Sequence, residues 1–172
     1  MKKILFLSIF LIILFTGCEN VKNTPTAKVE NFLSKYQNRD KTVLEELHYV
    51  IDKDKTMNDK QKELYKTLLE KQYQYLSYKI TNEEIIYDKA IVNIEIEVLD
   101  YKDTIKKVEE YYQNHVEEFP KENDYMDFKL QELKKVKSTI QYKMSIHLTK
   151  EDNKWKIEDL TSSDRKKIHG LY

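Results

Sequence analysis

The sequence has very little cysteine, glycine and proline, and it has no excess of charge of either sign. One of its 172 residues is cysteine, two are glycine and two are proline, while Lys+Arg and Asp+Glu each number 30. A single thiol excludes a disulfide within the chain and a zinc site built on several thiolates. Gly17 and Gly170 are too far apart to form a glycine-rich phosphate loop. Because the charges are balanced and finely mixed, we expect no nucleic-acid partner.

A short apolar run near the N-terminus is the most informative part of the chain. A Met-Lys-Lys start supplies positive charge, Ile4–Phe15 is the run, and the small residues Thr16 and Gly17 follow it. This order is typical of a secretory signal peptide. The run is too short to cross a bilayer, which takes about 20 apolar residues. The sequence therefore predicts that residues 1–17 are a cleaved signal peptide.

The stretch Leu14–Cys18 resembles the lipobox of bacterial lipoproteins. That family favours Leu, Val or Ile three residues before the cysteine, so Phe15 is a conservative departure from the pattern. The resemblance implies that Cys18 receives a diacylglyceryl group through a thioether, and two acyl chains give a stable anchor. We therefore expect a chain that is lipid-anchored at the outer face of the cell membrane. The alternative is an ordinary signal peptide followed by an incidental cysteine.

The remaining sequence predicts a short tether and one domain. Residues 19–23 are polar, and five residues reach at most about 18 Å. We thus divide the chain into a signal peptide at 1–17, a lipidated N-terminus with a tether at 18–23, and a single extracytoplasmic domain at 24–172.

Three amphipathic helices are expected first. A Thr24 cap with Pro25 behind it opens the first helix, and the third runs from about Asn58 to Lys71. Apolar residues recur with helical spacing in all three helices: Val29, Phe32, Leu33 and Tyr36; Val43, Leu44, Leu47, Val50 and Ile51; Leu64, Tyr65, Leu68 and Leu69.

Two pairs of strands and a helical hairpin follow. Apolar and polar residues alternate from Leu76 to Ile80 and from Ala90 to Val98, so these segments read as strands joined through residues 82–88. Helical spacing then returns on both sides of Pro120, with 122–124 as the connection and Asn123 or Asp124 as a cap. The last two strands alternate around Ile140–Leu148 and Trp155–Ile157, and a capped helical turn ends the chain.

Segregated runs of helices and strands predict an α+β fold. We expect an antiparallel sheet of about four strands with helices on one face, and a helical hairpin between the two strand pairs. This order resembles the nuclear-transport-factor-2-like and cystatin-like cone folds. The chain is also similar to small lipoproteins of unknown function from low-GC Gram-positive bacteria, through residues 24–37, 155–161 and 167–170. That resemblance implies no activity.

No set of residues suggests catalysis. The inner positions of the predicted strands hold aliphatic side chains, with only Tyr78 and Tyr142 adding a polar group, so we expect no enzyme and no cofactor. The four histidines are scattered along the chain. Residues 52–63 place oxygen-bearing side chains as a calcium loop does, but Met57 replaces the required glycine, so we interpret the segment as a loop that caps the third helix.

Two functions stay open on these grounds. The first is a non-catalytic binding or scaffold module, tethered to the membrane, with a protein partner in the cell envelope. The second is a carrier or sensor of a small apolar ligand, with a pocket near Tyr78, Tyr142 and Trp155. The aromatic groups at residues 73–78 and 111–119 are a further candidate surface, and packing of their rings within the fold is the alternative.

Overall fold

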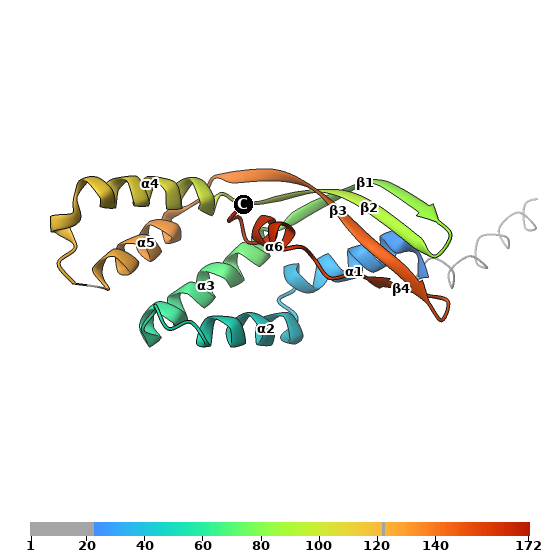
Figure 1. Ribbon diagram of the computed structural model, residues 1–172, viewed down its shortest axis with the longest axis horizontal. Coiled ribbons are helices and arrows are strands. Elements are labelled where there is room, and N and C mark those ends of the chain that lie inside the picture. The colour runs from blue at the N-terminus through green and yellow to red at the C-terminus, as the bar shows by residue number, and fades with distance from the viewer. Residues whose placement is uncertain (1–22, 122) are drawn as a thin grey trace, which may run out of the picture.

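A computed structural model describes residues 23–121 and 123–172 of the chain (Figure 1). The predicted signal peptide at 1–17, Cys18 and the tether up to residue 22 lie outside the described residues. The elements follow one another as α1 (Pro25–Gln37), α2 (Lys41–Asp52), α3 (Asp59–Tyr75), β1 (Ser77–Ile86), β2 (Lys89–Leu99), α4 (Tyr101–Asn114), the short 3-10 turn η2 (Val116–Glu118), α5 (Asp124–Lys135), β3 (Thr139–Glu151), β4 (Lys154–Ile157) and α6 (Ser162–Ile168).

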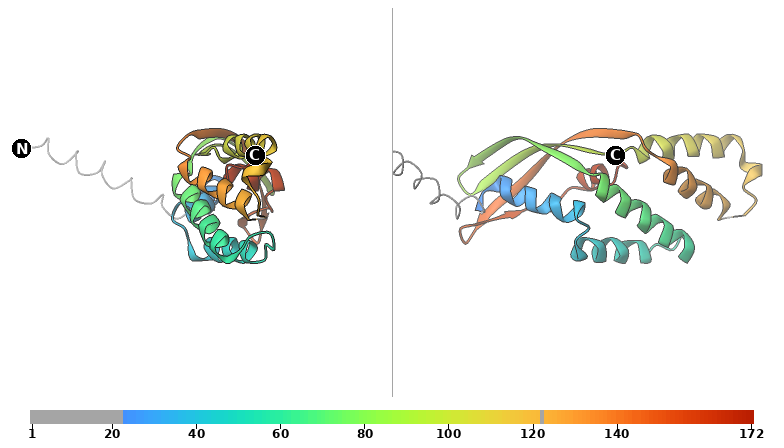
Figure 2. Two further views of the ribbon diagram at one scale, coloured as in Figure 1. Left: turned by 90° about the vertical axis from the view of Figure 1, so that its left-hand side faces the viewer. Right: turned by 180° about the vertical axis from the view of Figure 1, so that it is seen from behind.

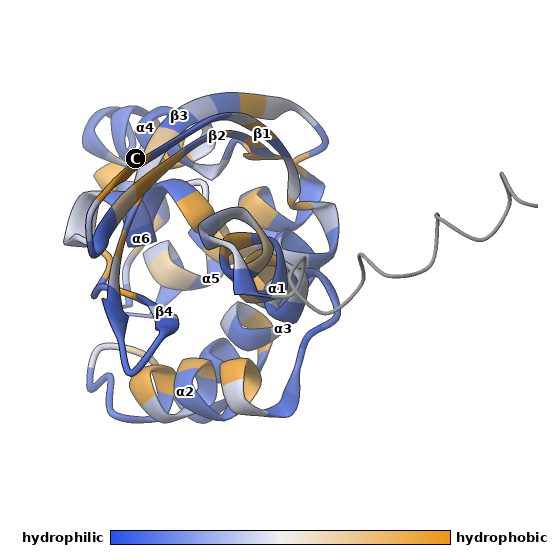
Figure 3. Cartoon of the chain, turned by 90° about the vertical axis from the view of Figure 1, so that its right-hand side faces the viewer, coloured by the Kyte–Doolittle hydropathy of each residue, from blue (hydrophilic) through white to orange (hydrophobic). Residues whose placement is uncertain are grey.

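Helices pack on one face of an antiparallel sheet, which confirms the predicted α+β class. In the described residues the strand order is β1-β2-β3-β4, so each strand is hydrogen-bonded to its neighbour in the sequence. The sheet curls around α1, which contacts β1, β2 and β4 (Figure 3). Helix α3 contacts both β2 and α5, and α2 packs on the outside of α3.

Strict alternation along β2 and β3 separates the two faces of the sheet. On the outer face Glu95 pairs with Lys143 at 3.7 Å, and the Ser145 hydroxyl donates to the side chain of Asn93 at 2.7 Å. The inner face is aliphatic as predicted, and its buried side chains form the centre of the core: Val92, Ile94, Ile96, Val98, Met144, Ile146 and Leu148.

Helix α1 begins where the sequence predicts. The Thr24 hydroxyl accepts a hydrogen bond from the Ala27 N–H at 3.1 Å, and Pro25 stands in the first turn. A second acceptor comes from the sheet, because the Glu83 carboxylate of β1 accepts from the Thr26 N–H at 2.8 Å. The free N–H groups and the dipole at a helix start favour a carboxylate there. This bond fixes the start of α1 against β1.

Strand β1 is longer than the sequence suggests. The predicted connection at 82–88 is wrong, since pairing with β2 continues to Ile86 and leaves a two-residue turn. The register shifts between Ile80 and Asn82, and such a bulge breaks the period of two by which a strand is recognised. After the shift Glu83, rather than an apolar residue, reaches the helix side of the sheet and caps α1.

Helix α3 also extends beyond its predicted end, to Tyr75 instead of about Lys71. Its start is as predicted. The Asn58 side chain accepts from the Gln61 N–H at 3.0 Å, and the Gln61 side chain accepts from the Asn58 N–H at 2.9 Å. The last turn of α3 buries Gln72 completely. Because glutamine does not count as apolar in a periodic pattern, the sequence ends the helix one turn early.

Helices α4 and α5 form the predicted hairpin between the strand pairs and project beyond one end of the sheet (Figure 1). The connection predicted at 122–124 is too short, because α4 ends at Asn114 and η2 follows before α5. Asn123 takes the N-cap position of α5 without a side-chain cap bond. Instead, Gln61 Nε2 of α3 donates to Asn123 O at 3.2 Å and to Asp127 Oδ1 at 2.9 Å. These bonds join the start of α5 to α3.

The exposed edge of β3 is covered by the end of the chain. Strand β4 is short and pairs with only one end of β3. Beyond it, the Glu158 N–H donates to His147 O at 2.9 Å, and Lys167 Nζ of α6 donates to Lys143 O at 3.2 Å. Covering unpaired edge groups in this way keeps a sheet from pairing with other chains.

The described part of the molecule is elongated, and its two ends differ (Figures 1 and 2). One end holds the start of α1 and the β1–β2 and β3–β4 turns, and there the Asn23 side chain donates to Asn153 O at 2.8 Å. We call it the Asn23 end. The opposite end is the tip of the α4–α5 hairpin. No helix among the described residues has the length and apolarity needed to span a bilayer.

Candidate functional site

Tyr78, Tyr142 and Trp155 do not come together in the fold. Tyr78 and Tyr142 pair with Ile96 of β2 from its two sides, so the three residues form one row across the sheet. Trp155 pairs with Lys150, eight residues further along β3 than Tyr142. At about 3.4 Å per residue this separation is about 27 Å. The structure thus brings two of the three predicted ligand residues together and places Trp155 near the Asn23 end.

Tyr142 and Trp155 both make contacts within the fold. The Tyr142 hydroxyl donates to Tyr172 O at 3.0 Å, and the two rings meet edge to face at 5.7 Å. Burial raises the pKa of Tyr142 and of Tyr78. Trp155 is only 6% exposed, and Lys150 Nζ lies 5.5 Å from the centroid of its ring. Packing in the fold accounts for both side chains.

The α4–α5 hairpin gathers aromatic rings at its tip. We call this cluster the aromatic tip, and its members are Tyr111, Tyr112, His115, Phe119, Tyr125 and Phe128. The sequence identified the Tyr111–Phe119 part of the cluster as a candidate surface. It missed the two rings of α5, since only the folding of the hairpin brings them beside α4. Spacing of i and i+3 places both α5 rings on one side of that helix.

Rings in the aromatic tip pack against one another across the hairpin. Tyr111 stacks on His115 with centroids 4.1 Å apart, and Tyr112 lies 4.4 Å from Tyr125. The Tyr111 hydroxyl donates to Glu118 Oε2 at 2.7 Å, and this bond raises the pKa of the Tyr111 phenol. Tyr111 is nevertheless 38% exposed, and the neighbouring Val116 is 51% exposed. The tip therefore presents apolar surface that the fold does not cover.

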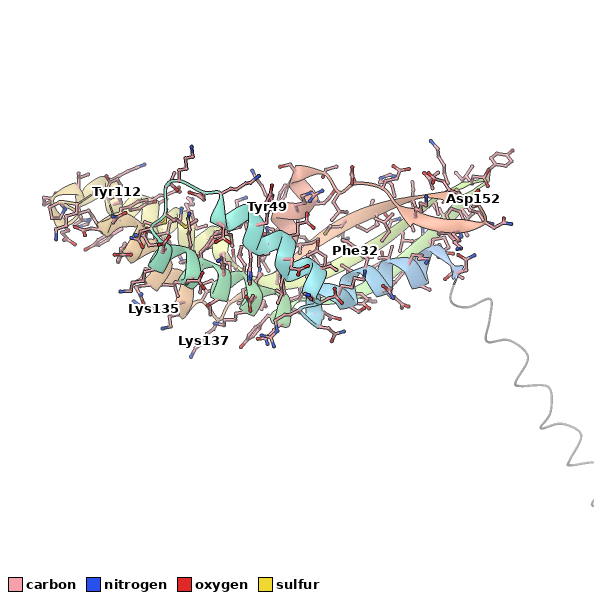
Figure 4. All side chains as sticks on the ribbon, turned by 90° about the horizontal axis from the view of Figure 1, so that it is seen from below. Phe32, Tyr49, Tyr112, Lys135, Lys137 and Asp152 are labelled. Atoms are coloured by element: carbon pink, nitrogen blue, oxygen red, sulfur yellow. The ribbon has the colours of Figure 1, made fainter. Side chains whose placement is uncertain are left out.

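A cleft of about 400 Å³ runs between α4 and α5 next to this surface. Its apolar lining comes from Val108, Tyr111, Phe128 and Val136, and three lysines stand around it, Lys107, Lys135 and Lys137. Figure 4 shows Tyr112, Lys135 and Lys137 toward one end of the molecule and Asp152 at the other. Glu132 also lines the cleft and pairs with Lys135 at 2.6 Å, while Lys107 pairs with Asp103 at 2.6 Å. The lining thus combines apolar and charged groups, and it suits an apolar side chain with a carboxylate that meets Lys137.

A second pair of side chains was not predicted as a pair, although Tyr73 belongs to the aromatic group at 73–78, in which it is buried and Tyr75 is exposed. Tyr73 of α3 and His169, just after α6, lie within hydrogen-bond distance, with 3.0 Å between the Tyr73 hydroxyl and His169 Nε2. They line a cleft of about 170 Å³, and Tyr36 packs edge to face on Tyr73 at 5.0 Å. Burial lowers the pKa of His169 to about 4, with a further contribution from Arg165, and burial raises the pKa of Tyr73.

The chemistry available at this pair is limited. The lowered pKa keeps the imidazole neutral at pH 7, so Nε2 either accepts a hydrogen bond from the Tyr73 hydroxyl or donates one to it, according to the tautomer. Glu46 and Arg165 line the same cleft, 3.6 Å apart. The pair is far apart in the sequence, and nothing in the spacing of single histidines could have revealed it.

The calcium-like segment at residues 52–63 has its carboxylates engaged by neighbours. Asp54 Oδ1 accepts from both the N–H and the hydroxyl of Thr56 at 2.6 Å, while Lys66 bridges Asp52 and Glu63 at 2.7 Å each. Asn58 caps α3, as predicted. Among residues 23–121 and 123–172, no three histidine, cysteine, aspartate or glutamate side chains are grouped so as to hold a metal ion.

Comparison with known protein families, curated proteins and solved structures finds no match to this chain.

Proposed function

We propose that the chain is a lipid-anchored, non-catalytic binding module at the outer face of the cell membrane. Its anchor is a diacylglyceryl group on Cys18, and its partner is a protein of the cell envelope that contacts the aromatic tip. The opposite placement of Asn23 and the aromatic tip carries this proposal, because a tether at one end leaves the other end free to meet a partner.

The length of the tether supports this arrangement. Between Cys18 and Asn23 the chain spans at most about 18 Å, so the Asn23 end stays near the lipid headgroups. Asn23 is in turn bonded to the β3–β4 turn through Asn153. When the long axis of the domain is directed away from the bilayer, the α4–α5 hairpin is its most distant part.

The composition of the aromatic tip supports a protein partner. Tyrosine and phenylalanine are enriched where protein surfaces bind one another, and tyrosine offers an apolar ring with a polar end. Tyr111 and Val116 remain partly exposed, and Lys137 stands beside the adjoining cleft. These groups fit a partner surface that carries an apolar side chain next to carboxylates.

Site-specific photocrosslinking in intact cells tests the proposal. The full chain carries a benzophenone side chain at Val116, in the tip, or at Tyr75, which is equally exposed at the end of α3. We expect a discrete crosslinked protein from position 116 that is missing from position 75. A second exchange, Tyr111→Ser, is expected to weaken that crosslink, since it removes an exposed ring of the tip that contacts His115 and Glu118 without touching the tether.

The anchor is tested separately. Cys18→Ser is expected to release the chain from the membrane fraction, while the wild type stays there after washing with high salt. Equal crosslinking from positions 116 and 75 contradicts the role of the aromatic tip, and a Cys18→Ser chain that stays membrane-bound contradicts the anchor.

A further inference from the structure

A patch of exposed apolar side chains lies at the turn between β1 and β2. Ile85 is 52% exposed, Ile86 62% and Tyr87 93%. Turns between strands normally carry polar residues. Here three consecutive apolar residues are exposed to water instead. We call these three residues the apolar turn.

The backbone of the apolar turn is strained at Tyr87, the most exposed of its three residues. Tyr87 has φ +55°, in the left-handed region where side chains other than glycine, asparagine and aspartate are disfavoured. The other two-residue turn, between β3 and β4, uses Asp152 and Asn153 at such angles, which suits their side chains. A tyrosine that is almost fully exposed in a conformation suited to glycine gains little from packing, and strain of this kind is concentrated at functional positions.

The apolar turn lies at the Asn23 end of the molecule. Both strand turns and the start of α1 are at this end (Figure 1), and the hydrogen bond from Asn23 to Asn153 fixes the chain there. The tether between Cys18 and Asn23 reaches at most about 18 Å. A chain anchored through Cys18 therefore holds the apolar turn within reach of the lipid headgroups.

We propose that the apolar turn inserts into the interface of the lipid bilayer as a second membrane contact beside the lipid anchor. The inference rests on the proposed lipid anchor and adds the orientation of the domain on the membrane. Tyrosine is well suited to this depth, because its ring is apolar and its hydroxyl stays hydrated at the headgroups. Two isoleucines extend the apolar contact on either side of the strand.

Apolar contact, rather than charge, drives the insertion. Residues near the turn carry both signs, with Glu84 and Asp88 against Lys89, and Asp152 against Lys154 at the other turn. Such a mixture gives little attraction to anionic lipid. Insertion is therefore expected in zwitterionic and in anionic bilayers alike.

Spin labelling of the lipidated full chain tests the inference. Asp88→Cys places a nitroxide directly beside the apolar turn and leaves Ile85, Ile86 and Tyr87 intact, while an acylated Cys18 has no free thiol to react. The chain is reconstituted into vesicles of phosphatidylcholine, with or without phosphatidylglycerol. We expect the ratio of oxygen to aqueous nickel-chelate collisions to be several-fold higher at position 88 than at a label introduced by Val116→Cys.

A matched variant shows that the apolar side chains cause the effect. In the Asp88→Cys chain, the added exchanges Ile86→Ser and Tyr87→Ser are expected to return the nitroxide to water, with the chain still bound through its lipid. An anchored chain whose label at 88 is as accessible to the nickel chelate as that at 116 overturns the inference alone. A chain that does not stay with the vesicles after washing overturns the proposed anchor and the inference together.

Discussion

Gln72 binds both backbone groups of Leu99, where α3 meets the end of β2. Leu99 N–H donates to Gln72 Oε1 at 2.9 Å, and Gln72 Nε2 donates to Leu99 O at 3.0 Å. Both residues are fully buried. One buried amide thus satisfies a donor and an acceptor that would otherwise be without partners at the strand end, directly before α4 begins.

Replacing this glutamine is expected to destabilise the fold strongly. In Gln72→Leu the Leu99 N–H and C=O stay buried without partners, and each such group costs about 1–3 kcal/mol. We expect the free energy of unfolding to fall by about 2–4 kcal/mol, measured by urea denaturation. Gln113→Leu, the same exchange at an exposed position of α4, serves as the control and is expected to change stability little. A loss of similar size in both variants would contradict the role given to Gln72.

Gly170 packs on the same pair of residues, and alanine is not tolerated there. Its φ is +67°, and a Cβ at this position would lie 2.1 Å from Leu99 O and 2.3 Å from Gln72 Nε2. Gly170→Ala is therefore expected to lower the free energy of unfolding by about 3 kcal/mol, through backbone strain and displacement of the buried amide. Lys166→Ala on the exposed side of α6 is the control, and thermal unfolding of both variants is the measurement.

Much of the fold follows from local pattern. The period of 3.6 located α1 and α2, the capping signals placed the starts of α1 and α3, and strict alternation located β2 and β3. Two of the errors have a common physical cause, since each lies where a polar residue occupies a core-facing position. Gln72 hid the last turn of α3, and Glu83, after the bulge in β1, hid the second half of that strand.

The candidate sites were less accessible to sequence reasoning, because they are made by tertiary contacts. Tyr73 and His169 meet through the packing of α6 on the core, and no local period links them. The α5 rings of the aromatic tip join those of α4 only through the hairpin. The sequence predicts a pocket near Tyr78, Tyr142 and Trp155, but strand alternation does not fix how far apart residues lie along a sheet. The resemblance to cone folds stays a prediction.

The free energy of unfolding is expected to decrease as the pH is lowered, because His169 becomes protonated more readily in the unfolded chain than in the folded one. Burial lowers the folded pKa to about 4, against about 6.5 for an exposed histidine, so the unfolded state binds more protons between these values. Neutral His169 makes its full contribution to the free energy of unfolding above pH 6.5, and this contribution is lost as the pH falls toward 4. The full loss is about 3 kcal/mol, since each unit of pKa shift contributes about 1.4 kcal/mol.

The His169→Phe variant isolates this effect. The phenyl ring fills the site but does not titrate, so the variant is expected to be less stable at pH 7, because the Tyr73 hydroxyl loses its partner. Its stability should then depend much less on pH between 6.5 and 4 than that of the wild type. Urea denaturation at a series of pH values provides the measurement, and equal slopes in both proteins would show that another group titrates.

Tyr87→Gly is expected to make the domain more stable, although it removes a large side chain. A tyrosine at φ +55° costs about 1–2 kcal/mol of backbone strain, and glycine avoids this cost while losing about 0.5–1 kcal/mol to the greater freedom of the unfolded chain. The net gain is about 0.5–1 kcal/mol, to be measured by urea denaturation. Asn153→Gly in the other turn is the control, and a smaller gain is expected because asparagine tolerates this conformation. If Tyr87→Gly lowers stability, the ring is needed for folding. If it raises stability, the tyrosine does not stabilise the domain at this position, which agrees with a role in membrane contact through the apolar turn.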